Sequence, residues 1–194
     1  NNKNFICQIG RRGVVPSFRK VEGDGGTPMG NFKISKIFYR NDKFNFLNLS
    51  KFSNFKIIKI TKNCIWYDDP RTKKYNRYEK LTNNPKPNFS YECLWRKDNV
   101  YDVIIVLNYN MQPIIAKKGS AIFIHCSFDD KRSTAGCISL DKKDLKNVSV
   151  LSKYHHRLTA KYTLPLCYNL LKHQGYEIFI YKNTISLLKD GECI

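Results

Sequence analysis

A cysteine and a histidine are the residues of this sequence whose types and spacing best suit covalent catalysis. Cys137 lies in the segment STAGCIS at residues 133–139, twelve residues after His125. A free thiol has a pKa of about 8.5, so only a small fraction of it is thiolate at neutral pH. A nearby imidazole can accept the thiol proton and later return it to a leaving amine. The pair therefore indicates acyl transfer through a thioester on Cys137.

Two backbone groups would complete such a site. Glycine at position 136 allows close approach of the backbone, so the amides of Gly136 and Cys137 could donate to an oxyanion. The carbonyl of Cys126 directly follows His125 and could accept a hydrogen bond from its ring. Spacing alone leaves a second interpretation open, because a histidine at a strand end and a cysteine after glycine are also common as buried core residues.

The elements that must position this pair are mostly strands. Runs of apolar or alternating residues predict strands at 4–9, 31–38, 55–60, 63–67, 101–109, 120–125 and 176–181. Residues 101–109 are apolar on both faces, which is typical of a central strand, and 120–125 is a second buried strand that ends on His125. We expect 55–60 and 63–67 to pair with each other, and the polar segment 69–87 to be a long surface excursion.

The pattern changes after Leu140. Residues 141–154 are predicted to form a helix with Asp141 as its N-cap. A second short helix is expected at 164–173, closed by Gly175. Residues from Lys182 onward are expected to form a tail. The sequence thus predicts a mainly β fold with a few helices late in the chain.

Composition excludes several classes of protein. The chain has 194 residues, of which 42% are hydrophobic and 13% aromatic, so a wholly disordered chain is excluded. No apolar run approaches the roughly 18 residues of a membrane-spanning helix. The net charge of +18 comes from 34 basic residues, 25 of them Lys, spread along the chain. This spread, with so much Lys, favours a solvated surface and the amino-acid usage of an AT-rich genome over specific nucleic-acid recognition. An anionic polymer as partner stays open.

Metal and cofactor sites are not indicated. The seven cysteines are odd in number and contain no CxxC pair, which argues against a zinc site and against a complete disulfide framework. The irregularly spaced residues that could ligate a metal are His155, His156, Cys167 and His173. The glycine-rich loop at 23–26 lacks the Lys-Ser/Thr of a phosphate-binding loop. We therefore expect no metal and no cofactor.

Several ordered motifs resemble one family. His125 followed by Thr134-Ala135-Gly136-Cys137-Ile138-Ser139-Leu140 resembles the catalytic signature of the L,D-transpeptidases, the YkuD-type domain of bacterial cell-wall enzymes. The segment GDGGTPMGNF at 23–32 resembles that family's Thr-Pro-x-Gly-x-Phe segment. Further blocks resemble one proteobacterial branch of this family. They lie at 9–13, 66–71, 75–77, 94–96 and 101–107. The resemblance covers roughly residues 4 to 145.

The resemblance implies a fold and a division of the chain. The fold would be a β-sandwich with a mixed sheet and a few, mostly C-terminal helices. Residues 1–145 would form the catalytic domain, and 146–194 a C-terminal extension of helices plus a strand, packed on the same domain or separate from it. It also implies a location in the periplasm or cell envelope. No leader is visible before Asn1, so a leader was either removed or never present.

The resemblance further implies roles for individual residues. Cys137 would be the nucleophile, His125 the general base, the Cys126 carbonyl the group that orients His125, and the Gly136 backbone an oxyanion donor. The substrates would be peptidoglycan stem peptides: a tetrapeptide stem acylates Cys137 and releases D-alanine, and an amine of a second stem resolves the thioester. The candidates for contact with the substrate are Thr134, Arg96 and Arg40.

The sequence departs from the common family pattern in three ways. Ala135 stands where His is usual before the glycine, and Ser139 stands where Arg or Asn is common two residues after the cysteine. The interval between His125 and Cys137 is also shorter than in the well-known members of the family.

Two other functions stay open. Water as the acceptor would make the protein an L,D-carboxypeptidase or endopeptidase, and a non-catalytic basic module would bind peptidoglycan or nucleic acid.

Overall fold

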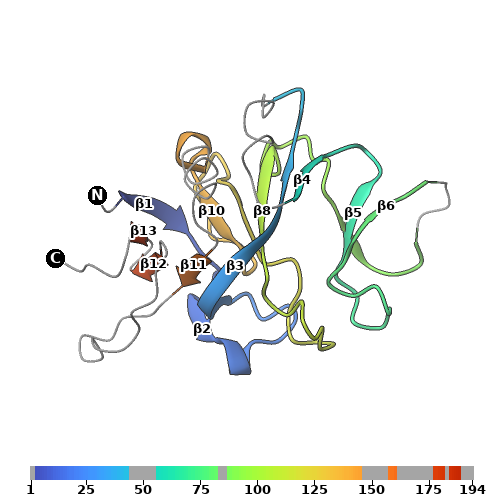
Figure 1. The fold of residues 1–194 in the computed structure, drawn as a ribbon, viewed down its shortest axis with the longest axis horizontal. Helices are drawn as coiled ribbons and strands as arrows, with labels where there is room; N and C mark the ends of the chain where they lie inside the picture. The colour runs from blue at the N-terminus through green and yellow to red at the C-terminus, as the bar shows by residue number, and fades with distance from the viewer. Residues whose placement is uncertain are drawn as a thin grey trace.

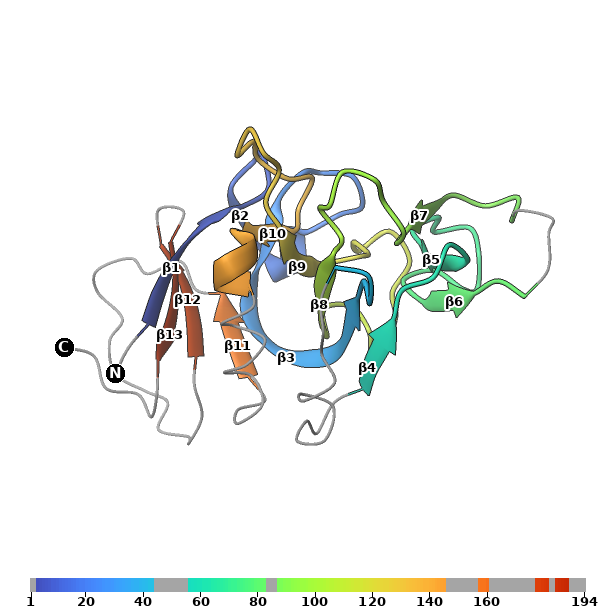
Figure 2. The ribbon, with the colours of Figure 1, turned by 90° about the horizontal axis from the view of Figure 1, so that it is seen from above.

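The protein has a mainly β fold with mixed sheets, as Figures 1 and 2 show. The structure is a computed structural model that describes residues 3–43, 56–82, 87–145, 157–160, 177–181 and 184–188. In these ranges helix is limited to the 3₁₀ turn η1 (Ser17–Arg19) and an α-helical turn at 142–145. The latter begins the helix predicted at 141–154. The remainder of that predicted range and the range 164–173, predicted as a second helix, lie outside the described residues.

Two sheets account for the strands of the described residues. The main sheet has ten strands, in the order β11-β3-β8-β9-β10-β1-β13-β12, with β2 and β4 also paired to β3. Its strands are β1 (Lys3–Gln8), β2 (Val14–Pro16), β3 (Thr27–Tyr39), β4 (Lys56–Lys59), β8 (Val103–Leu107), β9 (Phe123–Cys126), β10 (Ile138–Leu140), β11 (Arg157–Ala160), β12 (Glu177–Tyr181) and β13 (Thr184–Leu188). The smaller sheet has the order β6-β5-β7, with β5 (Cys64–Tyr67), β6 (Tyr78–Lys80) and β7 (Tyr91–Cys93).

Strands β8 and β9 form the centre of the main sheet because both of their faces are buried. Every residue of both strands is buried, as the apolar pattern of 101–109 and 120–125 predicted. One face carries a core cluster that includes Ile105 and Ile124. The other face carries a second cluster that includes Ile104 and Phe123. Successive residues of a strand point to opposite faces, so each strand supplies both cores.

The predicted pairing of 55–60 with 63–67 is wrong. β4 pairs in parallel with β3, whereas β5 turns away after a tight turn closed by the bond from the Cys64 amide to the Thr61 carbonyl. The turn allows Trp66 to bury its ring edge-on against Phe123, at 5.0 Å between ring centroids. The smaller sheet therefore packs against one face of the main sheet. The predicted excursion 69–87 also contributes a strand, β6, to the smaller sheet.

The predicted tail after Lys182 is also wrong, because residues 184–188 form strand β13. This strand pairs with β1 on one side and with β12 on the other, both antiparallel. The alternating sequence Thr-Ile-Ser-Leu-Leu supplies the reason, since it fits a strand that pairs with the otherwise exposed edge of β1. The strand predicted at 176–181 is confirmed as β12. Figure 1 shows β13 beside β1 and β11 beside β3.

A close backbone approach at Gly10 gives a first prediction. A Cβ added there would lie 2.3 Å from the Gly25 carbonyl oxygen and 2.9 Å from the Thr27 amide nitrogen. Both are backbone atoms that cannot rotate away. We expect Gly10→Ala to lower the free energy of unfolding by about 2–3 kcal/mol, as overpacking does.

Gly23→Ala is the matched control, because its φ of +74° is left-handed but a Cβ there would meet open space. It should cost only about 1 kcal/mol. Urea unfolding of both variants measures the difference. Equal losses would show that the Gly10–Gly25 contact does not constrain the fold.

Candidate active site

His125 lies on the buried β9 strand, on the face covered by the smaller sheet. Only 3% of its surface is exposed. Its Nδ1 atom is 2.8 Å from the carbonyl oxygen of Cys126. In the tautomer with hydrogen on Nδ1, the ring donates to this carbonyl and leaves Nε2 with a free lone pair. The contact expected between His125 and the Cys126 carbonyl is therefore present.

Cys137 directly precedes β10, which pairs in parallel with β9. The register places Ile138 opposite Ile124 and Ser139 opposite His125. Continued by one residue, it places Cys137 beside Phe123 and on the same face of the sheet as His125. Cys137 indeed packs against the core cluster that contains Phe123, while part of its surface stays exposed. Figure 2 shows the two strands side by side.

Two threonine hydroxyls hold the backbone around Cys137. The Cys137 carbonyl accepts hydrogen bonds from Thr134 Oγ1 at 2.6 Å and from Thr27 Oγ1 at 3.3 Å. The Gly136 amide donates to Thr134 Oγ1 at 3.1 Å. This amide would have to exchange that bond to serve an oxyanion. Thr27 comes from the TPMG segment, and no place in the site was predicted for it from the sequence.

The glycine at 136 is required by its conformation and by its surroundings. Its φ is +141°, and a Cβ there would lie 3.0 Å from the Gly26 carbonyl oxygen. Gly136 therefore lets the turn before Cys137 press against the glycine-rich loop at 23–26.

The Cys137 thiol donates a hydrogen bond to the Ala121 carbonyl, with 3.0 Å between sulfur and oxygen. Burial raises the pKa of this thiol to about 12, and the negative charge of Glu92 acts in the same direction. Burial lowers the pKa of His125 to about 4, against the effect of its bond to the Cys126 carbonyl. Both groups are therefore neutral at pH 7.

Aromatic rings surround the imidazole. The Tyr101 ring lies edge-on to His125 at 5.4 Å, and the Phe128 ring does so at 6.3 Å. Tyr101 donates its hydroxyl to Glu92 Oε2 at 2.6 Å, and burial raises the pKa of that carboxyl. These rings exclude water from His125. Glu92 could not be predicted from the sequence, and Tyr101 stood only at the start of the predicted strand 101–109 and of the resembling block 101–107.

The residues predicted to contact substrate already have partners within the protein. Buried Arg40 bonds Asp42, with 2.8 Å from Nε to Oδ1, and stacks on the Trp95 ring at 3.5 Å. Arg96 bonds Asp98, with 3.0 Å from Nε to Oδ1. The Thr134 hydroxyl is engaged with the Cys137 carbonyl, as described above. A substrate role for these three residues stays a prediction. Arg96 is partly exposed, and its charge helps to lower the pKa of His125.

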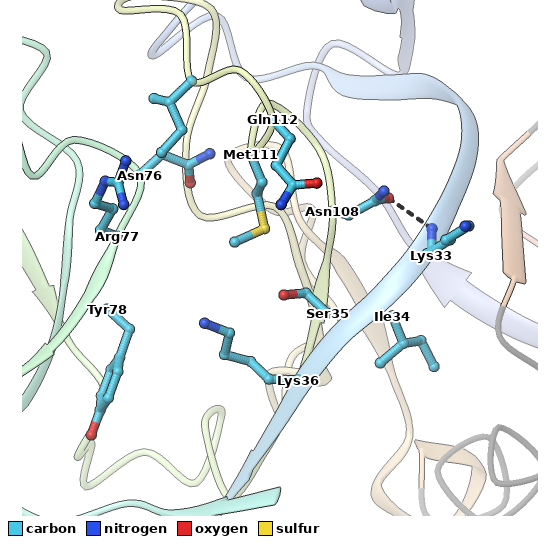
Figure 3. A pocket seen from close by; sticks show the side chains of 11 residues that line it. Lys33, Ile34, Ser35, Lys36, Asn76, Arg77, Tyr78, Asn108, Met111 and Gln112 are labelled. Atoms are coloured by element: carbon cyan, nitrogen blue, oxygen red, sulfur yellow. Dashed lines mark hydrogen bonds between the residues drawn. The ribbon is translucent and has the colours of Figure 1, made fainter. Parts of the chain in front are cut away.

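A cavity of about 620 Å³ lies on the same face of the main sheet, between β3, β6 and the loop that follows β8 (Figure 3). It is lined by Lys33, Ile34, Ser35, Lys36, Asn76, Arg77, Tyr78, Asn108, Met111, Gln112 and Ile114. Three of these side chains are basic and none is acidic. Burial, followed by the charge of Lys56, lowers the pKa of Lys36. A bound anion would offset this effect on Lys36, so a lining with three basic and no acidic side chains would favour an anionic ligand.

Among the described residues, no group of three His, Cys, Asp or Glu side chains could hold a metal ion. The four residues considered for a metal in the sequence lie outside this part of the chain. In the part that the structure describes, no helix is both long enough and apolar enough to cross a membrane.

The comparison with protein families settles which family these features belong to. A profile of the YkuD L,D-transpeptidase catalytic domain matches residues 1–151. The chain belongs to the YkuD family. The resemblance drawn from the sequence motifs is thereby confirmed, and the mixed-sheet β fold agrees with it. The match to the YkuD domain includes β1 to β10 and ends before β11. Neither a curated protein nor a solved structure matches the chain significantly.

The buried imidazole of this YkuD domain predicts a pH dependence of stability. Because the pKa of His125 falls from 6.5 to about 4 on folding, the unfolded chain binds a proton in this window that the folded chain does not. Stability should therefore fall as the pH decreases from about 6.5 towards 4, by on the order of 2–3 kcal/mol.

Urea unfolding of the wild type and of His125→Gln at pH 7.5 and 4.5 measures this effect. The other histidines are present in both proteins, so the difference between the two pH dependences isolates His125. Identical pH dependences would show that His125 titrates normally in the folded state.

Proposed function

We propose that this YkuD domain is a peptidoglycan L,D-transpeptidase in which Cys137 is the nucleophile and His125 the general base. The observation that carries the proposal is the parallel register of β9 and β10, which puts both side chains on one face of the sheet in a chain of this family. By family, the substrates are peptidoglycan stem peptides, and the enzyme works in the cell envelope.

The first half of the proposed reaction acylates the thiol. His125 Nε2 takes the proton from Cys137 Sγ as the sulfur attacks the carbonyl at the L-centre of the diamino acid in a tetrapeptide stem. The carbon–sulfur bond forms and the carbonyl oxygen becomes an oxyanion. Amides of Gly136 and Cys137 stabilise that charge. The carbon–nitrogen bond then breaks, and D-alanine leaves after its amine takes the proton from His125.

The second half releases the enzyme. An amine of a second stem attacks the thioester carbonyl and gives a proton to His125. The carbon–sulfur bond breaks, the sulfur recovers the proton, and an amide cross-link is formed. Every step moves a proton between the substrate or sulfur and one ring nitrogen, so the tautomer fixed by the Cys126 carbonyl serves the whole cycle.

The neutral resting state supports general-base catalysis. The pKa of His125, lowered to about 4, keeps its ring unprotonated throughout the neutral range. The thiol, whose pKa is raised to about 12, is a weak nucleophile until that ring accepts its proton. The aromatic walls formed by Tyr101 and Phe128 keep water away from the pair, which favours an amine over water as the acceptor.

The departures from the family pattern fall on either side of the thiol. Ala135 is exposed, and its methyl side chain offers no polar group near the oxyanion. Ser139 is buried beside His125 in the β9–β10 register and donates to Gln8 Oε1 at 3.1 Å. A small hydroxyl bound to Gln8 thus stands where the family commonly has a larger, often charged side chain.

Product analysis with purified tetrapeptide muropeptides tests the function. A cross-linked dimer with one D-alanine lost is the expected product, identified by mass spectrometry. A trimmed monomer without a dimer would instead indicate an L,D-carboxypeptidase or endopeptidase. Unchanged substrate would indicate a non-catalytic binding module.

Substitution of the two site residues gives the matching prediction. Cys137→Ala should abolish turnover without unfolding the protein, since alanine fits a small, mostly apolar site. His125→Ala should lower kcat by about 10²–10⁴-fold, the usual effect of losing a general base.

Cys93→Ala is the control, because Cys93 is exposed on β7 and has no place in the proposed site. It should keep wild-type activity. Full activity in Cys137→Ala, together with its loss in Cys126→Ala, would mean that the nucleophile is assigned to the wrong thiol.

A further inference from the structure

One buried amide joins the smaller sheet to the segment that holds the thiol. Asn76 is 1% exposed and belongs to the loop between β5 and β6. Its Oδ1 accepts hydrogen bonds from Trp66 Nε1 at 3.1 Å and from the Ala121 amide at 3.0 Å. Its Nδ2 donates to the carbonyls of Tyr109 at 3.2 Å and Asn110 at 2.8 Å. All four hydrogen-bonding positions of this amide are therefore occupied.

Ala121 is held in a conformation that alanine rarely adopts. Its φ is +52°, in the left-handed region, which is unfavourable for a residue with a Cβ. Its side chain is buried, and its amide is bound by Asn76. This backbone turn directs the Ala121 carbonyl at Cys137, whose thiol donates to it at 3.0 Å. The contacts thus run without a gap from Asn76 through one residue to the sulfur.

We propose that Asn76 is a positioning residue for the Cys137 thiol and acts through Ala121. The Ala121 carbonyl fixes the sulfur and binds its hydrogen while the site is free of substrate. In the proposed reaction this hydrogen leaves the Ala121 carbonyl and passes to His125 when the stem peptide binds. The effect on turnover rests on the proposed function, but the effect on the thiol does not.

The placement of Asn76 explains why the smaller sheet matters to the site. The Trp66 ring packs edge-on against Phe123 of β9, so the network is anchored to the main sheet as well. Asn76 also has a left-handed φ of +54°, which asparagine tolerates better than most residues. Figure 3 shows Asn76 at the same end of the cavity as Met111. The amide therefore lies between that cavity and the segment at Ala121.

The S–H stretching band of Cys137 tests the proposal directly, because its frequency falls when the thiol donates a hydrogen bond. The band is identified in the folded protein by an infrared difference spectrum against Cys137→Ser. Asn76→Gly removes the amide but tolerates the positive φ, so the band should shift to higher frequency. Asn76→Asp keeps an acceptor for the Ala121 amide, and its protonated carboxyl can still donate to the Asn110 carbonyl, so the band should stay close to its wild-type position.

Activity supplies the second measurement. Asn76→Gly should lower kcat by about 10–100-fold with KM within about two-fold, as expected when a reacting atom is misplaced. Ile105→Val is the matched control, since Ile105 is fully buried in the core on the opposite face of β8. It should lower stability while changing neither the S–H band nor kcat.

The outcomes separate the two proposals. An unchanged S–H band in folded Asn76→Gly would overturn the positioning role. Should Asn76→Gly fail to fold, Asn76→Ser replaces it, because its hydroxyl is too short to reach the Ala121 amide, and the same shift is expected. If the band shifts in Asn76→Gly but the wild-type protein releases no D-alanine, the positioning role is retained and the proposed function is rejected.

Discussion

The parallel pairing of β9 with β10 is the interaction on which the rest of the site depends. It brings together two segments that the chain separates by a loop at 127–137, and its register decides which side chains share a face. A slip of one residue would turn Cys137 away from His125, because side chains alternate along a strand. Buried residues on both faces of β9, such as Phe123 and Ile124, oppose such a slip.

The glycine-rich and threonine-rich motifs support the turn before β10. Thr27 accepts a bond from the Gly10 amide at 2.8 Å and donates to the Cys137 carbonyl, so it joins the segment that follows β1 to the backbone of Cys137. Asp24 forms a buried ion pair with Lys20 at 2.6 Å and accepts from the Gly26 amide. The Asp24 side chain thus stabilises the loop at 23–26, and the Gly26 carbonyl of this loop lies close to Gly136.

The sequence predicted the centre of the fold because local pattern was enough there. Strands apolar on both faces must be central, and His125 at the end of one of them must lie inside. The smaller sheet was missed because β6 and β7 have three residues each and gain their stability from partners on β5. β13 was missed because its partner, β1, lies at the other end of the chain.

The site was predictable only as far as side-chain chemistry shows in the sequence. Cys137 and His125 could be proposed from their types and from family motifs. The contacts of Ala121 and Asn76 could not be predicted, since Ala121 makes them through its backbone and Asn76, although within the resembling block 75–77, makes them with distant residues. The charge of Arg96 suggested a substrate contact, although Asp98 two residues later was a visible sign of an internal partner.

The measurement that tests the account most directly is the intact mass of the protein mixed with a tetrapeptide stem and quenched in acid. We expect a single adduct equal to the stem less its terminal D-alanine, carried on the peptide that contains Cys137. The adduct should be absent from Cys137→Ala. An adduct on another residue, or release of D-alanine by Cys137→Ala at the wild-type rate, would contradict the assignment of this thiol as the nucleophile.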